Sequence, residues 1–191
     1  MFGAVLDTCV LWPSLQRDFL LSLAIEGLYR PLWSEAILAE LHRHEQLKLI
    51  DRGANETDAA ATADFLLDQM RYAFGDAIVQ DWEALEGTFG LPDIDDEHVL
   101  AAAVIGGAGA IVTENLKDFP SAAVPSTIQI ISARDFAADA VDVNPASAVR
   151  ALDQLSARHT RTPHTPAGIL DILVARYGMN EVDEILRPIV G

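Results

Sequence analysis

The feature that most constrains the fold is an alternation of short apolar runs with longer stretches of helical periodicity. Residues 2–6, 110–112 and 127–131 are apolar runs too short for buried helices. Between them lie stretches with apolar residues three or four positions apart, at residues 14–28, 34–49, 56–74 and 95–105. Strands that alternate with helices are typical of a parallel sheet covered by helices. We therefore expect an α/β fold with a parallel sheet.

The final third of the chain has a purely helical pattern. Residues 145–158 and 166–177 are its clearest helices, with a linker or turn at residues 160–164. We expect one domain over residues 1–135 and a helical C-terminal extension over residues 136–191. The apolar stripes of this extension must be buried, by default against the domain and otherwise against a second copy or a partner protein.

Charge and cysteine content limit the function classes. Twenty-nine acidic residues against 13 Lys and Arg give a net charge of −16, which argues against a broad non-specific nucleic-acid surface. The same charge suits a protein that binds divalent cations or a basic partner. A single cysteine, Cys9, excludes an intramolecular disulfide and favours a reducing compartment. No signal-like segment opens the sequence, and the longest apolar stretch, residues 99–112, is too short to cross a bilayer. We expect a cytoplasmic protein without membrane contact.

Three acidic residues lie at positions where burying a carboxylate would be costly unless it had a function. Asp7 ends the first apolar run, at the strand edge where open α/β sheets bind ligands. Asp96 precedes the apolar stripe of its helix at the same face, and Glu40 borders an apolar helix face. Each also has an ordinary interpretation: Asp7 could cap a turn or the next helix, Asp96 could be a first-turn residue favoured by the helix dipole, and Glu40 could be a solvated side chain.

A polar loop follows the apolar run at residues 110–112. It carries Asn115 and Asp118 near another carboxyl edge of the expected sheet, or it is an ordinary loop with Asx turns. Several acids at one edge repel one another unless a hard cation neutralises them. Oxygen ligands suit Mg²⁺ or Mn²⁺, which can activate water for phosphodiester hydrolysis.

These segments occur in a familiar order. Leu6-Asp7-Thr8 and residues 38–41, 93–103 and 112–120 resemble, in sequence and spacing, the PIN-domain ribonucleases of the VapC toxin type. The resemblance covers residues 1 to about 135. The remainder is similar to a subgroup with a helical C-terminal extension.

The resemblance implies an α/β/α sandwich and a metal-dependent endoribonuclease that uses Mg²⁺ or Mn²⁺. It also implies an RNA substrate, a cognate antitoxin and, in many relatives, a homodimer. The fourth acid position falls on Asp118 or on Asn115. The catalytic and metal-binding set implied is Asp7, Glu40, Asp96 and Asp118, with Thr8, Thr113 and Asn115 as supporting residues.

Other polar and aromatic residues have mainly structural interpretations. Arg43 and Lys48 lie about one and two turns beyond Glu40 and could guide an RNA backbone, but a solvated helix face is favoured. Trp12, Trp33 and Trp82 are expected to pack in the core or at an interface rather than to stack on bases. Cys9 is expected to be a small buried hydrophobe rather than a nucleophile, and His98 to point away from the site.

Two other functions remain open. A non-catalytic acidic module, or a degenerate toxin, would act by holding a basic protein partner, and its binding would survive chelation of metal. A phosphotransferase of the HAD type needs a second acid two residues after the first. Because Cys9 occupies that position, this alternative ranks low.

Overall fold

The computed structural model describes residues 1–158 and 164–190, and its centre is a parallel sheet. The strand order is β2-β1-β3-β4, and each neighbouring pair is parallel. The strands are β1 (Gly3–Leu6), β2 (Arg30–Leu32), β3 (Ala110–Val112) and β4 (Gln129–Ile131). β1 and β3 are buried on both faces, which is why they read as continuous apolar runs.

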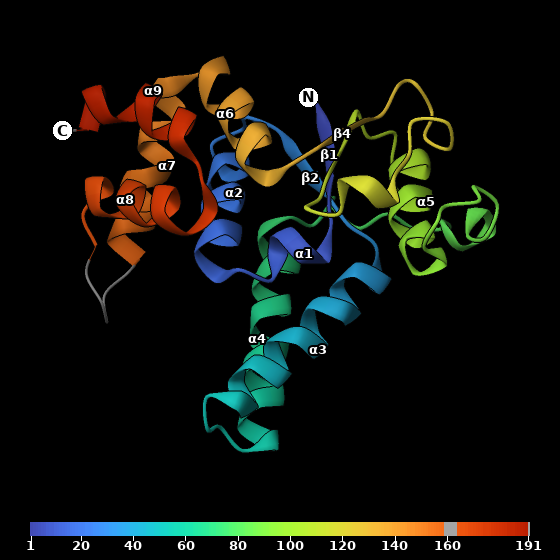
Figure 1. Cartoon of the computed structure of the whole chain (residues 1–191). Coiled ribbons are helices and arrows are strands. Elements are labelled where there is room, and N and C mark those ends of the chain that lie inside the picture. The colour runs from blue at the N-terminus through green and yellow to red at the C-terminus, as the bar shows by residue number, and fades with distance from the viewer. Residues whose placement is uncertain (159–163, 191) are drawn as a thin grey trace.

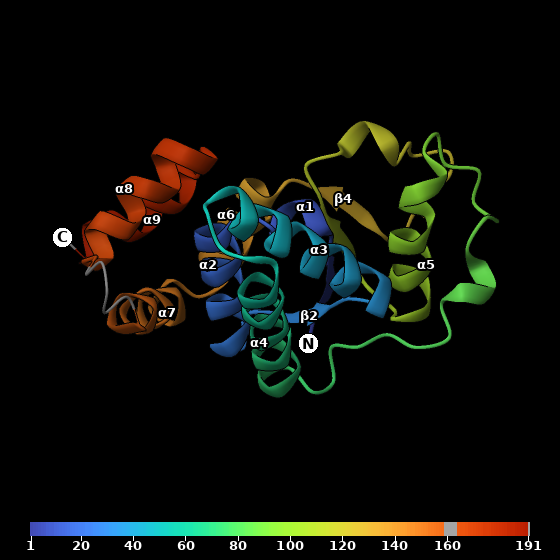
Figure 2. The ribbon, with the colours of Figure 1, turned by 90° about the horizontal axis from the view of Figure 1, so that it is seen from below.

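Helices lie on both sides of this sheet. α5 lies on one side, and α2 and α6 lie on the other, as Figures 1 and 2 both show. The expected α/β/α arrangement is therefore confirmed. The helices are α1 (Thr8–Leu11), α2 (Ser14–Ile25), α3 (Glu35–Asp51), α4 (Glu56–Ala73), α5 (Glu97–Ile105), α6 (Ala133–Val143), α7 (Pro145–Arg158), α8 (Pro166–Tyr177) and α9 (Asn180–Val190).

Local sequence signals set several helix ends. Ser34 Oγ accepts the backbone N–H of Ile37 and caps α3, and Thr165 caps α8 in the same way. Gly178 ends α8 in the left-handed conformation at φ 66°, which favours glycine. The helix expected from residue 95 begins later, because a 3₁₀ turn over Ile94–Asp96 precedes α5. This turn brings Asp96 to the start of α5.

Two groups of helices extend away from the sheet. α3 and α4 pack on each other as a hairpin that projects from the carboxyl end of the strands (Figure 1). α7, α8 and α9 pack together, and α7 packs on α2. Leu152, Leu170 and Leu186 are fully buried, so the apolar stripes of the tail pack within this chain, as expected by default.

The division at residue 135 stays a prediction, and it falls inside α6. Of the linker expected at residues 160–164, only His164 lies within the described residues. Among residues 1–158 and 164–190, none of the helices has the length and apolar character needed to span a bilayer.

Candidate active site

The carboxyl edge of the sheet carries a pocket of about 480 Å³. Asp7 directly follows β1, and Thr113 directly follows β3. α1 and α3 lie at the same end of the strands (Figure 1). The pocket thus collects residues from distant segments: Asp7, Thr8, Cys9, Trp12, Pro13, Glu40, His44, Asp96 and Asn115.

Asp7 is held from the protein side by hydroxyl and thiol donors. Thr113 Oγ1 donates a hydrogen bond to Asp7 Oδ2 at 2.6 Å, and Cys9 Sγ donates to the same oxygen at 3.1 Å. Asp7 occupies the N-cap position of α1 but makes no capping hydrogen bond with its side chain. The interpretation of Asp7 as a helix cap is therefore wrong. Its buried carboxylate lines the pocket and does not serve to cap α1.

Asp96 carries the least compensated charge of the pocket. It lies at the N-terminus of α5 without a capping side-chain bond, while Asp93 caps the preceding turn. Burial and, after it, the charges of Asp7, Asp93 and Asp118 together raise the pKa of Asp96 to about 6, against a smaller lowering by His98. The acids therefore lie close enough to repel one another, which is what a cation would relieve.

Asn115 and Asp118 are the two candidates for the fourth site residue, and the structure places them differently. Asn115 lines the pocket, whereas Asp118 is not among the described residues that do so. The Asp118 charge nevertheless acts on Asp96. Thr113 Oγ1 also accepts the backbone N–H of Asn115 at 3.0 Å, which links Asn115 to the donor of Asp7.

Glu40 has protein partners on both carboxylate oxygens. Thr8 Oγ1 donates to Oε2 at 2.7 Å, and His98 Nε2 lies 3.1 Å from Oε1. Burial alone would raise the pKa of Glu40, but the bonds from His98 and Thr8 outweigh it and lower the pKa. Glu40 is therefore an ionised group that the protein itself neutralises in part.

His98 was expected to point away from the site, and that expectation is wrong. Its side chain reaches Glu40 from α5 and packs edge-on against Trp82. Burial lowers its pKa, but the hydrogen bond and charge of Glu40 raise it more. The signal that could have located it is its i+3 and i+4 spacing to Ala101 and Ala102, which are fully buried.

Cys9 is a hydrogen-bonding thiol rather than an apolar filler. Besides donating to Asp7, its sulfur accepts the backbone N–H of Glu114 at 3.2 Å. Burial and the charge of Asp7 raise the pKa of Cys9 to about 12, so the thiol stays protonated. This agrees with the expectation that Cys9 is no nucleophile.

Glu97 supports the site without facing it. Its buried carboxylate accepts the backbone N–H groups of Phe89, Gly90 and Leu91 at 3.2, 2.7 and 3.1 Å. Burial would raise its pKa, but these bonds outweigh it and lower the pKa. Glu97 thereby fixes the loop that leads into the start of α5 and Asp96.

The pocket suits a hydrated hard cation better than a fully protein-enclosed one. Among the described residues, no three His, Cys, Asp or Glu side chains come together closely enough to surround one ion. Mg²⁺ needs only one or two carboxylates and keeps several waters. The hydrogen bonds to Asp7 go to Oδ2, which leaves its Oδ1 available, and the side chain of Asp96 makes no capping hydrogen bond. The donor set therefore fits Mg²⁺ or Mn²⁺ on Asp7 and Asp96.

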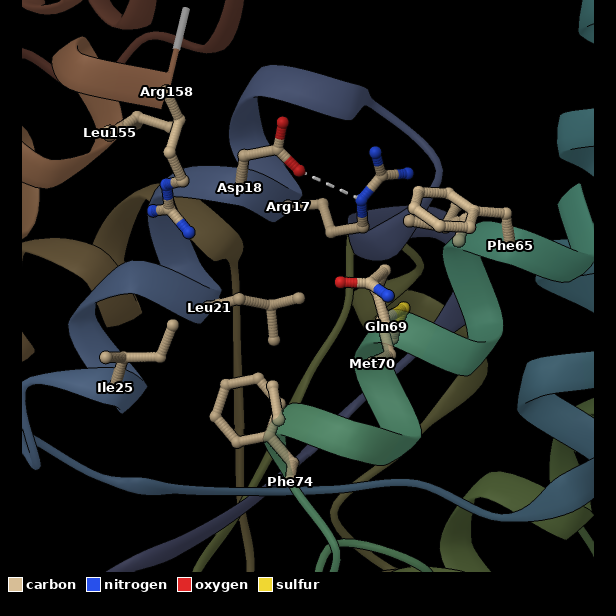
Figure 3. A pocket seen from close by; sticks show the side chains of 12 residues that line it. Arg17, Asp18, Leu21, Ile25, Phe65, Gln69, Met70, Phe74, Leu155 and Arg158 are labelled. Atoms are coloured by element: carbon tan, nitrogen blue, oxygen red, sulfur yellow. Dashed lines mark hydrogen bonds and ion pairs between the residues drawn. The ribbon is translucent and has the colours of Figure 1, made fainter. Parts of the chain in front are cut away.

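A separate groove between α2, α4 and α7 lacks this chemistry. Its volume is about 470 Å³, and its walls are mainly apolar side chains such as Leu21, Met70 and Phe74 (Figure 3). Its one acid, Asp18, pairs with Arg17 at 3.2 Å. The carboxylate pocket is therefore the candidate active site.

The basic and aromatic residues singled out earlier have different positions. Arg43 is exposed and lines neither of these hollows, while Lys48 lies in a further groove next to the carboxylate pocket. Trp33 and Trp82 are buried, as expected. Trp12 is 43% exposed on the pocket wall, so it does not pack in the core, while packing at an interface stays a prediction.

Comparison with known proteins identifies the family. The family model for the PIN domain matches residues 3–117, more than half of the chain. The chain belongs to the PIN-domain family. Over 79 residues it is 38% identical to "Putative ribonuclease VapC50" of Mycobacterium tuberculosis, a match that spans 41% of this chain and 47% of that relative. The aligned region is thus about half of the relative's length. No solved structure matches the chain.

Proposed function

We propose that the protein is a metal-dependent endoribonuclease of the VapC type. The observation that carries the proposal is the meeting of Asp7 and Asp96 in one pocket, where burial and then the neighbouring carboxylates raise the pKa of Asp96 to about 6. Membership of the PIN-domain family and similarity to a relative named as a ribonuclease support the same activity.

Asp7 and Asp96 would hold Mg²⁺ or Mn²⁺. When bound, the ion supplies a water activated for in-line attack and neutralises charge on a phosphoryl oxygen. Thr113 and Cys9 orient Asp7 by hydrogen bonds to Oδ2. Because both oxygens of Glu40 already have partners, we propose that Glu40 acts through water, positioned by Thr8 and His98.

The fourth position belongs to the same proposal. Asn115 lines the pocket and can contact the substrate, and Asp118 adds negative charge behind Asp96. We assign residues 1–135 to the nuclease domain and residues 136–191 to the helical extension. By analogy with the toxin relatives, the proposed partners are an RNA substrate, a cognate antitoxin with a basic segment, and a second copy of the chain.

The decisive experiment is cleavage of a mixed pool of labelled single-stranded RNA by the purified protein. Wild type would be compared in Mn²⁺, Mg²⁺ and EDTA with Asp7→Asn and Asp96→Asn. Asp95→Asn is the matched control, because Asp95 is an exposed neighbour that does not line the pocket. We expect cleavage that needs a metal ion, Asp7 and Asp96, and that Asp95→Asn retains to within about twofold.

Two results would contradict the proposal. Full metal-dependent cleavage by Asp96→Asn would remove Asp96 from the catalytic set. No cleavage under any condition, with binding of a basic protein that survives EDTA, would favour the non-catalytic module. That alternative draws on the net charge of −16.

A further inference from the structure

A second hollow adjoins the candidate active site on the side of the C-terminal extension. This hollow, which we call the α3–α8 groove, has a volume of about 660 Å³ and is lined by the start of α2, the end of α3 and the C-terminal half of α8. Trp12 and Pro13 line both the groove and the carboxylate pocket. The two hollows therefore border each other along Trp12 and Pro13.

The groove has a small excess of cations over acids in a protein that is otherwise acidic. The whole chain has only 13 Lys and Arg against 29 acids, yet Lys48, Arg52 and Arg176 all line this hollow. Arg52 and Arg176 are exposed. Of the charges that line it, Asp18 is paired with Arg17 at 3.2 Å and Lys48 with Glu45 at 2.5 Å, so the exposed charges of the groove are Arg52 and Arg176 against Asp51. Clustered cations beside a site for phosphodiester chemistry suit a phosphate backbone.

Aromatic side chains accompany these cations. Trp12 is 43% exposed at the boundary of the two hollows, and Tyr177 of α8 is half-buried in the groove. Lys48 Nζ lies 6.0 Å from the centroid of the Trp12 ring, and His44 packs edge-on to that ring at 6.3 Å. The indole is thus supported by neighbours while a large part of it faces solvent. Cations combined with an exposed ring are typical of surfaces that bind single-stranded nucleic acid.

We propose that the α3–α8 groove binds the single-stranded RNA that flanks the cleaved phosphate, and this rests on the nuclease function proposed above. One base stacks on Trp12 at the exit of the active site. The phosphates that follow lie along Lys48, Arg52 and Arg176. Because Arg176 and Tyr177 belong to α8, the helical extension forms part of the substrate path.

Binding can be tested separately from cleavage, by fluorescence anisotropy of a labelled 12-nucleotide single-stranded RNA in EDTA at several salt concentrations. The variants are Arg52→Gln with Arg176→Gln, Trp12→Ala and Trp12→Phe. Arg71→Gln is the control, since Arg71 is a partly exposed cation paired with Glu35 that lines neither hollow. Trp12→Phe keeps an aromatic face and guards against a folding defect.

The double arginine variant should lower the slope of log affinity against log salt by about 1.4, from about 0.7 for each lost phosphate contact. Trp12→Ala should weaken binding about tenfold, while Trp12→Phe stays within about threefold of wild type. Arg71→Gln should leave both quantities unchanged. An unchanged slope in the arginine variant, or unchanged affinity in Trp12→Ala, would overturn the proposal, as would a wild-type protein that binds no RNA at any salt.

The two proposals fail in different ways. If the protein cleaves RNA with a metal ion but the arginine variant binds RNA like wild type, RNA binding by the groove is refuted and the nuclease function is retained. If the protein binds RNA with the expected salt slope and Trp12 dependence but cleaves no RNA, binding by the groove is supported and the nuclease function is refuted.

Discussion

Replacing Asp96 with asparagine should stabilise the metal-free protein while abolishing cleavage. The pKa of Asp96 is raised from 3.8 to about 6 because the carboxylate is partly buried and lies near Asp7, Asp93 and Asp118. A raised pKa in an acid means that the folded state favours its neutral form. Above pH 6 the ionised carboxylate therefore lowers stability, and a neutral amide of the same shape removes this penalty.

The size of the gain follows from the pKa difference. A shift of about 2 units corresponds to about 3 kcal/mol at most, at about 1.4 kcal/mol per unit. Because Asp96 is only half-buried, solvent screening reduces the expected gain to about 1–1.5 kcal/mol. For a chain of this size that raises the melting temperature by about 2–6 °C. The gain should shrink as the pH falls from 6 and vanish below the unfolded pKa of 3.8.

The assay is thermal unfolding of wild type, Asp96→Asn and Asp95→Asn in EDTA, at pH 7.5 and again at pH 4. We expect the gain for Asp96→Asn alone and mainly at the higher pH. An equal gain at both pH values would show that repulsion is not its origin. Saturating Mg²⁺ or Mn²⁺ should stabilise wild type, by about 2.7 kcal/mol at a hundredfold excess over Kd, and should stabilise Asp96→Asn less.

Three further changes test the support around the site. Thr113→Val removes the donor to Asp7 in a fully buried position, so unfolding should become easier by about 1–3 kcal/mol and metal affinity should fall, as urea titration and metal titration would show. Glu97→Gln should lower the melting temperature at pH 7. Because the pKa of Glu97 is lowered in the folded state, its contribution to stability is fully present above pH 4.5 and is lost as the pH falls through the folded pKa. The melting temperatures of wild type and variant should therefore become equal in acid. Leu152→Ala should cost about 2–5 kcal/mol and shift a single unfolding transition, whereas two transitions would show that the extension unfolds by itself.

The sequence was sufficient for β1, β3 and β4 because these strands lie in short, mainly apolar runs that admit few other structures. It was also sufficient to bring Asp7 and Asp96 toward one edge, since parallel strands share their carboxyl end. It did not reveal the pair formed by Glu40 and His98, which lie 58 positions apart and meet only when α3 packs near α5. Nor did it reveal α1, because a helix of four residues has no periodicity to detect.

The hydrogen bonds of the pocket are distributed unequally, and this asymmetry indicates where a cation would bind. Asp7 receives Thr113 and Cys9, and both oxygens of Glu40 have partners. Within the described residues no hydrogen bond reaches the carboxylate of Asp96, and burial with the charges of Asp7, Asp93 and Asp118 outweighs the opposite effect of His98. A cation therefore gains most by binding at Asp96 and sharing the available oxygen of Asp7. Selection for stability alone would remove such a carboxylate, and the metal site proposed above would account for its presence in the pocket.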